Sequence, residues 1–481
     1  MGKPLYLTTT LPYVNAEPHI GFALEMVQAD VIARYRTLLG DEVFFNTGTD
    51  EHGLKIFRKA EEEGKDTQAY VDEYAAKFKS LKGKLNLHPG LHFIRTTDAH
   101  HKAAAQEMWR RCLAKGDIFK KKYKGLYCVG DEAFIKETDL VDGKCPNHST
   151  MEPIEIEEEN YFFRLSAYQE KLLVYLSREG VIVPEWRREE AINFVRLGLE
   201  DFSISRTKEK MPWGVPVPDD DTQVMYVWFD ALTNYISTLG WPEDAGGNFK
   251  KFWTEGETLQ LAGKDQVRFQ SIMWQGMLMS AGLEATDQVI YHGFITSDGT
   301  KMSKSLGNVI DPLAVAGEYG IDALRYFLAR HVRPFEDSDF TMEKFKEAYN
   351  ANLANGLGNL AARVMQLAES NLEKPVFAGD ETFVFTYSPQ IREAMGRYDL
   401  NTVMDSIWAA VSGIDQMIQK DQPFKVVKDD KKRGAEMITA LVKQLAWIAK
   451  AIEPFMPDTS MKILQAVMEN KKPENLFPRK D

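Results

Sequence analysis

Two lysines that bracket small residues give the strongest chemical signal in the chain. They are Lys301 and Lys304, in the run Lys-Met-Ser-Lys-Ser at 301–305. A mobile loop with two ammonium groups is suited to gripping a triphosphate whose charge redistributes during a reaction. The alternative is a solvent-exposed basic turn. Five specified residues in a row would arise by chance in a chain of this length with a probability on the order of one in ten thousand, so a phosphate-binding loop is favoured.

A second candidate phosphate site lies near the N-terminus, where His19 and Gly21 follow the loop 11–18. A histidine and a glycine at a strand-to-helix junction direct a ring N–H and backbone N–H groups to one point, beside the positive end of the helix dipole. Such a point suits a phosphate. The tripeptide His-Ile-Gly by itself favours a helix-capping loop with a surface histidine, so this site depends on the other motifs.

Periodicity in the first third of the chain indicates the elements that would position these residues. Strands are predicted at 5–9, 42–46 and 91–96, and helices at 21–39, within 51–81 and up to 115. The rhythm returns with strands at 259–262 and 289–292 around a helix at 266–280. Such alternation predicts a parallel sheet covered by helices, and we expect a Rossmann-like, doubly wound α/β fold.

The rest of the chain departs from this alternation twice. Short, turn-rich and aromatic pieces between about 123 and 218 predict an insertion, and amphipathic helices at 345–370, 389–420, 435–452 and 460–468 predict a closing helical bundle. The expected division is therefore 1–118 and 223–295 for the two halves of the α/β domain, 119–222 for a connective insertion, 296–345 for the lysine loop and the region after it, and 346–481 for the helical domain.

Composition is that of an ordinary soluble globular protein, with 44% hydrophobic and 27% charged residues in 481. There is no apolar run of about eighteen residues and no signal-peptide core, so a cytosolic protein without membrane contact is expected. The net charge of −12 gives no basic footprint for nucleic acid. Basic patches at 120–124 and 420–433 still allow RNA contact, although either is equally compatible with a solvated charged face.

Together, the His-Ile-Gly and Lys-Met-Ser-Lys-Ser motifs resemble the signature of class I aminoacyl-tRNA synthetases. The resemblance extends to methionyl-tRNA synthetase in five further segments, which occur in that family's order at 45–53, 159–163, 227–231, 263–265 and 476–479. Their order and spacing, spread over essentially the whole chain, carry the resemblance. It implies that the methionine carboxylate attacks the α-phosphate of ATP and expels pyrophosphate. The terminal ribose hydroxyl of tRNA then attacks the methionyl-adenylate.

The resemblance also implies a methionine site. In the family, a carboxylate matching Asp50 and backbone near Leu11 hold the ammonium group. Aromatic walls and one polar group near sulfur suit a soft, weakly hydrogen-bonding thioether, whereas the residues alone would equally fit a plain core. The expected methionine-binding residues are Leu11, Tyr13, Asp50, Trp228, Ala231, Tyr235, Gln270 and Trp274.

For the ATP site, the resemblance implies that the enzyme positions two anions and neutralises charge on the leaving pyrophosphate. His19, Lys301 and Lys304 are the expected catalytic residues, with Mg²⁺ bridging phosphate oxygens. The adenosine site is expected at the carboxyl edge of the sheet. The expected ATP-binding residues are His19, Gly21, Phe22, Gly263, Asp265, His292, Gly293, Phe294, Lys301, Met302, Ser303 and Lys304.

Residues 355–363 resemble the family's anticodon-facing helix, which implies that Asn359 and Arg363 contact the CAU anticodon of the initiator and elongator methionine tRNAs. Phe424 stands where the family has a tryptophan that stacks on the first anticodon base. Phenylalanine can also stack on an unpaired base, but it lacks the indole N–H.

Three cysteines cannot form a disulfide framework. Cys128 with Asp131 and Cys145 with His148 form two ligand pairs that resemble the family's zinc knuckle, with an aspartate where a cysteine is expected. A carboxylate can bind zinc, although this set is less usual for a structural site. One zinc ion and a knuckle held by packing around two buried thiols remain as alternatives.

The sequence departs from the family pattern at four other positions. Phe22 replaces the second histidine of the HIGH motif, and Phe294 replaces a tryptophan near the adenine site. Gln270 and Gln266 occupy positions usually held by histidine and isoleucine beside the methionine side chain. Gln270 can still offer an amide N–H near sulfur, whereas the polarity of Gln266 has no explanation in the sequence.

Two other functions compete with methionine activation. A class I synthetase for a branched-chain amino acid would carry a longer insertion, and one for cysteine would place zinc ligands in the amino-acid pocket. A catalytically silent paralogue that binds tRNA is opposed by the lysine motif, His19 and Asp50. Because the chain ends soon after the bundle, we expect a monomer.

Overall fold

The computed structural model describes residues 2–129, 133–135, 137–146, 152–297, 299–302, 308–377 and 383–480. Contacts divide the chain into two compact units. Unit 1 comprises residues 1–18, 40–82 and 89–291, and unit 2 comprises residues 19–39, 83–88 and 292–481. The helix that begins after His19 therefore belongs to the same unit as the C-terminal bundle.

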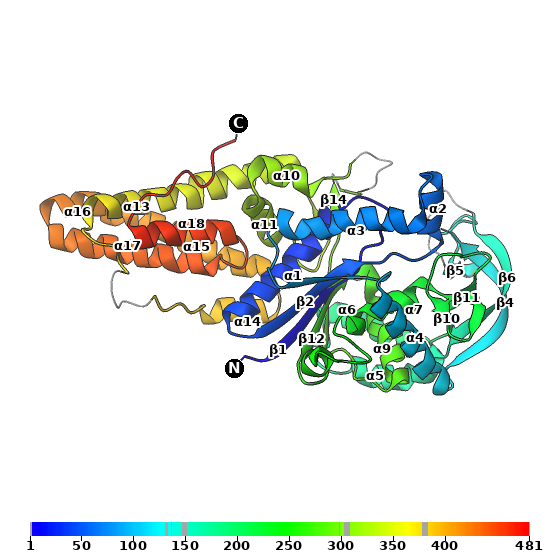
Figure 1. Cartoon of the computed structure of the whole chain (residues 1–481). Helices are drawn as coiled ribbons and strands as arrows, with labels where there is room; N and C mark the ends of the chain where they lie inside the picture. The colour runs from blue at the N-terminus through cyan, green and yellow to red at the C-terminus, as the bar shows by residue number, and fades with distance from the viewer. Residues whose placement is uncertain are drawn as a thin grey trace. The chain divides into compact units, whose positions relative to one another are not determined.

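The centre of unit 1 is a six-stranded sheet in the order β3-β2-β1-β12-β13-β7. Its strands β2, β1 and β12 are labelled in Figure 1. β1 (Pro4–Thr9) pairs in parallel with β2 (Glu42–Thr49) and β12 (Glu257–Gly263), and β2 pairs in parallel with β3 (Leu91–Arg95). β13 (Gln288–His292) pairs in parallel with β7 (Ile182–Val183). The predicted Rossmann-like parallel sheet is confirmed. Strand order reverses between β1 and β12, and such folds bind ligands at the carboxyl ends of the strands at this switch point.

The central strands are buried on both faces, as parallel strands covered by helices are. All of β1 except its first residue is buried, and the same holds for β12. The helices of unit 1 include α2 (Leu54–Glu62), α3 (Thr67–Lys84), α4 (Ala99–Ala114), α7 (Val227–Leu232), α8 (Asn234–Ser237) and α9 (Trp274–Ala281). Its core contains the fully buried rings of Trp109, Trp274 and Tyr6.

The insertion forms an antiparallel sheet in the order β5-β4-β6-β8, from β4 (Ile118–Cys128), β5 (Ala133–Ile135), β6 (Ile154–Phe163) and β8 (Phe202–Ser203). Its register explains part of the basic run at 120–124, because the last two lysines of the run lie opposite acidic residues of β6. Lys122 lies opposite Glu159 and Lys124 opposite Glu157, and Lys124 Nζ is 2.6 Å from a carboxylate oxygen of Glu155. Charge pairing across strands, and not only solvation, accounts for this part of the patch.

The insertion also contains a small sheet in the order β10-β11-β9, from β9 (Ser205–Thr207), β10 (Pro216–Val217) and β11 (Asp220–Met225). Two helices, α5 (Gln169–Leu176) and α6 (Glu185–Arg196), and the edge strand β7 come from the same stretch of chain. The sequence analysis did not predict that the insertion contributes β7 to the main sheet.

Unit 2 begins with α1 (Ile20–Leu38) and continues with a small sheet of β14 (Ile295–Ser297), β15 (Thr300–Lys301) and β16 (Ser338–Asp339). α10 (Pro312–Tyr319) and α11 (Ile321–Arg330) follow β15, and the sequence analysis did not predict either helix. α12 (Met342–Ala348) and the π-helical segment η7 (Tyr349–Gly358) lead into the bundle.

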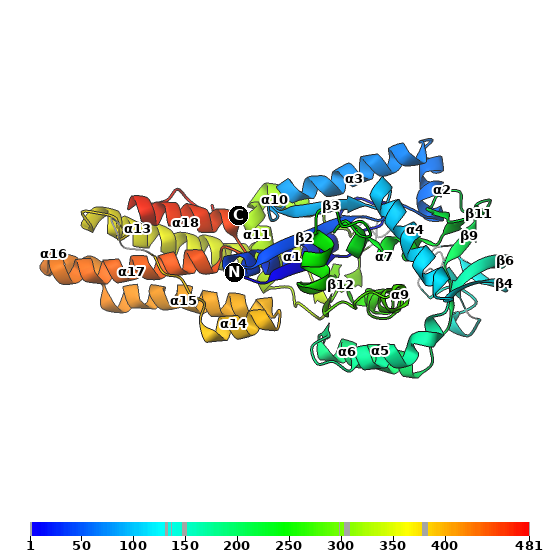
Figure 2. The ribbon, with the colours of Figure 1, turned by 60° about the horizontal axis from the view of Figure 1, so that its bottom comes forward.

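The bundle confirms the predicted helical C-terminal region. Its helices are α13 (Asn359–Asn371), α14 (Pro389–Gly396), α15 (Leu400–Asp421), α16 (Pro423–Asp429), α17 (Lys431–Ala451) and α18 (Pro457–Glu469). Figures 1 and 2 show α13, α15, α17 and α18 side by side, with α16 at one end of the bundle. Side-chain caps from Ser388, Asp399 and Asp430 begin α14, α15 and α17. Within the described residues, none of the helices has the length and apolarity needed to cross a membrane.

Candidate active site

Backbone hydrogen bonds bring the end of β2 to the loop that follows β1. Tyr13 and Asp50 form an isolated parallel bridge. The N–H of Asp50 donates to the carbonyl of Pro12 at 3.0 Å, and the N–H of Val14 donates to the carbonyl of Asp50 at 3.2 Å. Leu11 and Asp50 are both buried. Three residues expected to bind methionine are thus brought together at the carboxyl edge of the sheet.

Gln270 connects the aromatic part of the expected methionine site. It lies in the π-helical segment η5 (Phe269–Met273), and such segments are frequent at functional sites. Its side chain is 1% exposed. Its Nε2 donates to the Tyr235 hydroxyl at 2.7 Å and to Thr10 Oγ1 at 3.4 Å. Because the Tyr235 oxygen accepts this bond, its own proton points to a different acceptor.

The aromatic rings next to Gln270 form two contacts. The rings of Tyr235 and Trp274 lie 5.8 Å apart at 58°. Trp228 stacks on Phe269 at 3.8 Å and 15°. Ala231 lies one turn after Trp228 on α7 and is buried. The sequence analysis missed Phe269 and Thr10, although both adjoin predicted residues in the chain.

A buried carboxylate on α7 lies between two histidines. Asp230, between Trp228 and Ala231 in sequence, is fully buried. Its Oδ2 is 3.2 Å from His52 Nδ1 and its Oδ1 is 3.7 Å from His101 Nε2. Burial alone would raise the pKa of Asp230, but the neighbouring imidazoles of His52 and His101 lower it. The pair of histidines thus anchors the helix that carries Trp228 and Ala231.

His101 contributes a second bond to this cluster, since its Nδ1 lies 2.9 Å from Ser237 Oγ on α8, the helix of Tyr235. Burial lowers the pKa of His101, and the neighbouring Asp230 opposes this shift. The sequence analysis missed the His52–Asp230–His101 cluster. His52 and Asp230 lie in the family-like segments 45–53 and 227–231, but nothing in the sequence pairs them.

Glu51 fixes the residue next to Asp50. Its fully buried carboxylate accepts two hydrogen bonds from Arg95, from Nε at 2.7 Å and Nη2 at 2.8 Å. The hydroxyls of Thr49 and Thr97 each donate to it at 2.5 Å. A planar guanidinium that bonds both carboxylate oxygens is a strong and directional contact, so the segment after β2 is held in one conformation.

Two expected ATP residues lie in unit 1, on the other side of the switch point. Gly263 ends β12, and Asp265 lies in the 3₁₀ turn Lys264–Gln266 that follows. Gln266 Nε2 donates to Asp265 Oδ2 at 3.1 Å. This bond explains the polarity of Gln266, because the amide holds the exposed carboxylate of Asp265 instead of extending the apolar pocket.

The other expected ATP residues lie in unit 2. His19 is exposed and caps α1, where its Nδ1 accepts the N–H of Gly21 at 3.1 Å. Since Nδ1 accepts, the proton of a neutral ring is on Nε2, so Nε2 is the N–H donor of this ring. Phe22 follows in the first turn, and its N–H donates to the carbonyl of His19 at 3.0 Å.

His292 is buried at the end of β13 and has a partner at each ring nitrogen. Nδ1 lies 2.7 Å from the carbonyl oxygen of Gly293, and Nε2 lies 2.9 Å from Glu25 Oε2 on α1. A carbonyl can only accept, so the proton of this first bond is on Nδ1. The sequence analysis missed Glu25, a buried carboxylate in a helix whose neighbours Leu24, Met26 and Val27 are apolar.

Gly293 is required by close approach of two chain segments. A Cβ at this position would lie 2.1 Å from the carbonyl carbon and oxygen of Glu336. The next residue, Phe294, donates its N–H to Asp337 Oδ1 at 2.9 Å. The run 292–294 is thus held directly against residues 336–337.

The lysine loop starts as a strand and continues beyond the described residues. Lys301 lies opposite Thr296, and the N–H of Gly299 donates to Asp339 Oδ1 at 2.8 Å. That backbone bond is the main cause of the lowered pKa of Asp339, with Lys344 and Thr296 adding to it. Met302 follows the strand, and the predicted residues Ser303 and Lys304 lie outside the described residues.

The expected anticodon residues lie in unit 2. Asn359 begins α13 and is exposed, and Arg363 lies one turn later on the same face. The guanidinium of Arg363 forms an ion pair with Asp415 on α15. Phe424, near the start of α16, is 41% exposed. Each of the three therefore has some exposed surface for a nucleotide.

Cys128 ends β4, and both it and Cys145 are buried. The predicted partners Asp131 and His148 lie outside the described residues. Within the ranges that the structure describes, no three His, Cys, Asp or Glu side chains gather as metal ligands. Cys112 lies apart in the core, where burial raises the pKa of its thiol to about 12.

Comparison with known proteins gives consistent matches. The family model described as tRNA synthetases class I (M) matches residues 5–152 and 147–365. The chain is 41% identical over 478 residues to the methionine–tRNA ligase of Caldanaerobacter subterraneus subsp. tengcongensis, covering 97% of this chain and 74% of that protein. It is 39% identical over 482 residues to that of Rhizobium meliloti, covering 97% and 92%. Mycobacterium tuberculosis methionyl-tRNA synthetase in complex with methionyl-adenylate superimposes with a TM-score of 0.88 at 37% identity, covering 100% of this chain and 99% of that one.

Proposed function

The chain belongs to the methionyl-tRNA synthetase family of class I, and from that premise we propose that the residues described above divide its reaction among them. It is an enzyme that activates methionine with ATP, releases pyrophosphate and transfers methionine to tRNA. Asp50 binds the methionine ammonium group together with backbone near Leu11. Tyr13, Trp228, Ala231, Tyr235 and Trp274 surround the side chain, with Gln270 near sulfur.

The hydrogen bond from Gln270 to Tyr235 carries this assignment, because it orients a polar group, the Tyr235 hydroxyl, among the aromatic rings. A thioether is a weak acceptor and a polarizable group. An aromatic pocket with one polar group near sulfur therefore matches methionine, whereas an aliphatic side chain has no atom that could accept a hydrogen bond. Hydrophobic fit alone discriminates between similar side chains by only about 1–3 kcal/mol, so this polar group contributes to the selection of methionine.

His19, Lys301 and Lys304 grip the phosphates during adenylate formation. The tautomer of His19 supports its role as a donor from Nε2. Gly21, Phe22, Gly263, Asp265, His292, Gly293, Phe294, Met302 and Ser303 complete the ATP site. Mg²⁺ bound together with ATP would supply further charge neutralisation. Little proton transfer is needed in this step, so positioning and charge stabilisation provide most of the rate.

Exchange of labelled pyrophosphate into ATP tests this proposal, with each standard amino acid supplied in turn. We expect exchange with methionine and at least about a hundredfold less with leucine or isoleucine. Exchange with cysteine or a branched-chain amino acid would assign the chain to another class I specificity. Binding of tRNA without exchange for any amino acid would leave only the silent paralogue.

We assign the CAU anticodon of initiator and elongator tRNA(Met) to Asn359, Arg363 and Phe424, on the 346–481 domain. We also propose that residues 1–118 and 223–295 form the two halves of the α/β domain, that residues 119–222 form the connective insertion, and that residues 296–345 form the lysine loop and the region after it. A monomer in the cytoplasm is the expected state, since tRNA and ATP are present there. A solution mass of twice the chain mass of 54.8 kDa would contradict the monomer.

One zinc ion bound by Cys128, Asp131, Cys145 and His148 is the proposal for the knuckle. Two buried thiols support it, because thiolates are preferred zinc ligands. A metal assay on the purified protein and on an Asp131→Ala variant tests it. Loss of zinc in the variant is expected, whereas unchanged zinc would remove Asp131 from the ligand set, and no zinc in either would leave a knuckle held by packing.

A further inference from the structure

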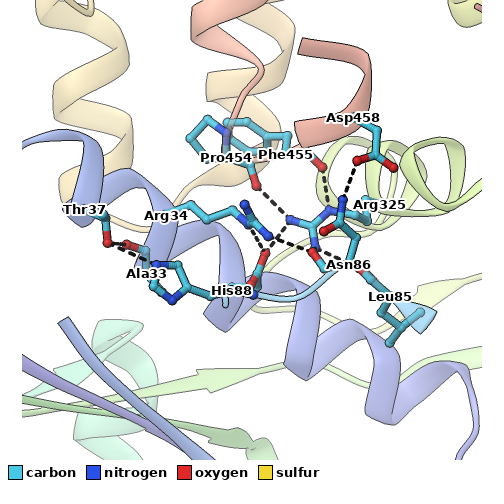
Figure 3. Close-up of polar contacts among 11 residues, drawn as sticks. Ala33, Arg34, Thr37, Leu85, Asn86, His88, Arg325, Pro454, Phe455 and Asp458 are labelled. Atoms are coloured by element: carbon cyan, nitrogen blue, oxygen red, sulfur yellow. Dashed lines mark hydrogen bonds and ion pairs between the residues drawn. The ribbon is translucent and has the colours of Figure 1, made fainter. Parts of the chain in front are cut away.

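Arg325, on α11, is fully buried in unit 2, and all of its N–H groups have acceptors (Figure 3). A guanidinium has five N–H donors, and the structure gives five bonds. Nε donates to Phe455 O at 2.8 Å, Nη2 to Pro454 O at 2.8 Å and to Asp30 Oδ2 at 2.6 Å, and Nη1 to Leu85 O at 3.3 Å and Asn86 O at 3.4 Å. One side chain thus ties together three other chain segments.

Asp30, on α1, is a second centre of the same network. It is fully buried, and its Oδ2 also accepts from Arg34 Nε at 2.7 Å. Its Oδ1 accepts the backbone N–H of His88. Both oxygens of the carboxylate are therefore used, and α1 is tied to residues 85–88 as well as to α11.

Asn86 joins this network to the start of α18. Its Nδ2 donates to Asp458 Oδ1 at 2.8 Å, and its carbonyl accepts from Arg34 Nη2 at 2.8 Å. Asn86 has a φ of +47°, in the left-handed region that non-glycine residues rarely adopt. Such a conformation persists where the surroundings determine it. The Arg325 network, meaning Asp30, Arg34, Asn86, Arg325 and the carbonyls of 454–455, is thus conformationally specific.

The main effect of the network is to fix the relative positions of the elements that it joins. Removing two charges from water is costly, and well-packed apolar residues would often hold the same elements together equally well. What five directional bonds add is one fixed arrangement of α1, α11, residues 85–88 and the turn between α17 and α18. Tyr35 of α1 strengthens this arrangement, since its ring lies 5.3 Å from that of Tyr387, whose hydroxyl donates to Ala451 O at the end of α17.

α1 and the helical bundle, which this network joins, carry residues with different proposed roles in the reaction. α1 begins at His19, the exposed residue to which we assign the phosphates. The bundle carries Asn359, Arg363 and Phe424, to which we assign the anticodon. α17 and α18 belong to that bundle and meet at the turn that Arg325 holds.

We propose that Arg325 and Asp30 couple anticodon binding on the bundle to the position of α1, and thereby of His19, during transfer of methionine to tRNA. This inference rests on the proposed function of both ends. Arg325 is a positioning residue, because it acts through α1 and touches no substrate. Without tRNA, the bonds of Asp30 to Arg34 and to the backbone of His88 still hold α1, so methionine activation should depend on Arg325 much less than transfer to tRNA does.

An Arg325→Lys variant tests the coupling, because lysine keeps the charge but has only three donors. Methionine-dependent pyrophosphate exchange without tRNA should stay within about threefold of the original enzyme. The kcat for charging tRNA with a CAU anticodon should fall at least about tenfold. The kcat ratio between this tRNA and one with a single altered anticodon base should shrink by a similar factor, while the KM ratio remains.

Arg330→Lys is the matched control. Arg330 is on the same helix and contacts Asp405 on α15 at 2.9 Å. Within the described residues its side chain also contacts Tyr326 and Trp408, and neither lies on α1. It should leave the kcat ratio unchanged. If Arg325→Lys does not fold, Asp458→Asn weakens only the half-buried bond to Asn86 and should shrink the same ratio by about threefold.

The outcomes separate the inference from the proposed function. An unchanged kcat ratio in Arg325→Lys, or an equal loss of exchange and charging, would overturn the coupling while leaving the anticodon assignment intact. An original enzyme that charges both tRNAs equally would overturn the anticodon assignment, and the coupling with it. A kcat ratio between the two tRNAs that shrinks at least about tenfold in Arg325→Lys, with pyrophosphate exchange preserved, supports both the coupling and the anticodon assignment.

Discussion

The side-chain amide of Gln270 donates to the hydroxyl of Tyr235 at 2.7 Å, and the Tyr235 ring lies 5.8 Å from that of Trp274 in unit 1. Gln270→Leu removes this donor and leaves a buried hydroxyl less well satisfied, which costs about 1–3 kcal/mol. We expect the KM for methionine in pyrophosphate exchange to rise about tenfold, with the KM for ATP unchanged. Gln288→Leu, which removes a bond to the carbonyl of Gly180 at the first residue of β13, is the control. Parallel changes in both KM values would contradict the assignment of Gln270 to methionine.

Arg95→Met should destabilise unit 1, because it leaves the fully buried carboxylate of Glu51 without its charged partner. Breaking a buried ion pair in this way costs about 3 kcal/mol or more. Denaturant unfolding followed by tryptophan fluorescence measures it. Lys59→Met is the comparison, since Lys59 and Glu62 form an exposed, solvent-screened pair whose loss should leave the stability almost unchanged. Equal losses for the two variants would show that the Glu51 carboxylate is satisfied without Arg95.

His331 should make unit 2 less stable in mild acid. Burial, with help from the charge of Arg330, lowers its pKa to about 4, while Asp405 partly opposes the shift. In the unfolded chain the pKa of a histidine is about 6.5. Between these two values the unfolded state holds a proton that the folded state lacks, so stability falls as pH decreases from about 6.5 to about 4. His331→Gln should lose less stability than the original protein over this window in thermal unfolding. A stability difference between the two proteins that is the same at pH 7 and pH 4 would rule this out.

Gly293→Ala should impair ATP binding, because the new methyl group would lie 2.1 Å from the backbone of Glu336 and displace residues 292–294. We expect the KM for ATP to rise about tenfold and the binding of methionine alone to be unaffected. Gly317→Ala is the control, since an added Cβ there meets no atom within 4 Å. An ATP affinity that survives the Gly293 substitution would exclude this segment from the nucleotide site.

The main sheet was predictable because its strands are buried on both faces and show as short apolar runs, as in Leu5 to Leu7. β7 has only two residues, which is too short for a periodic signal. α10 and α11 are short helices separated by Gly320 at a φ of +92°. Neither fills the window of about 11–18 residues over which helical periodicity is recognised.

Family motifs name the candidate site residues, whereas the contacts that the fold makes between distant residues could not be predicted. Asp230 lies between His52 and His101, and Glu51 bonds Arg95, across long stretches of sequence. No spacing rule connects such partners. The polarity of Gln266 likewise became intelligible only through its bond to Asp265.

The central claim is that Asp50 binds the ammonium group of methionine, and paired removal of the two charges tests it. The dissociation constants of methionine and of its analogue without the amino group are measured by calorimetry for the original enzyme and for Asp50→Asn. Loss of the amino group should weaken binding to the original enzyme by about a hundredfold and to Asp50→Asn by less than about threefold, because the partner is then already absent. Asp72→Asn, which changes a more exposed carboxylate paired with Arg95, should behave like the original enzyme. An equal penalty for the missing amino group in the original enzyme and in Asp50→Asn would contradict the account.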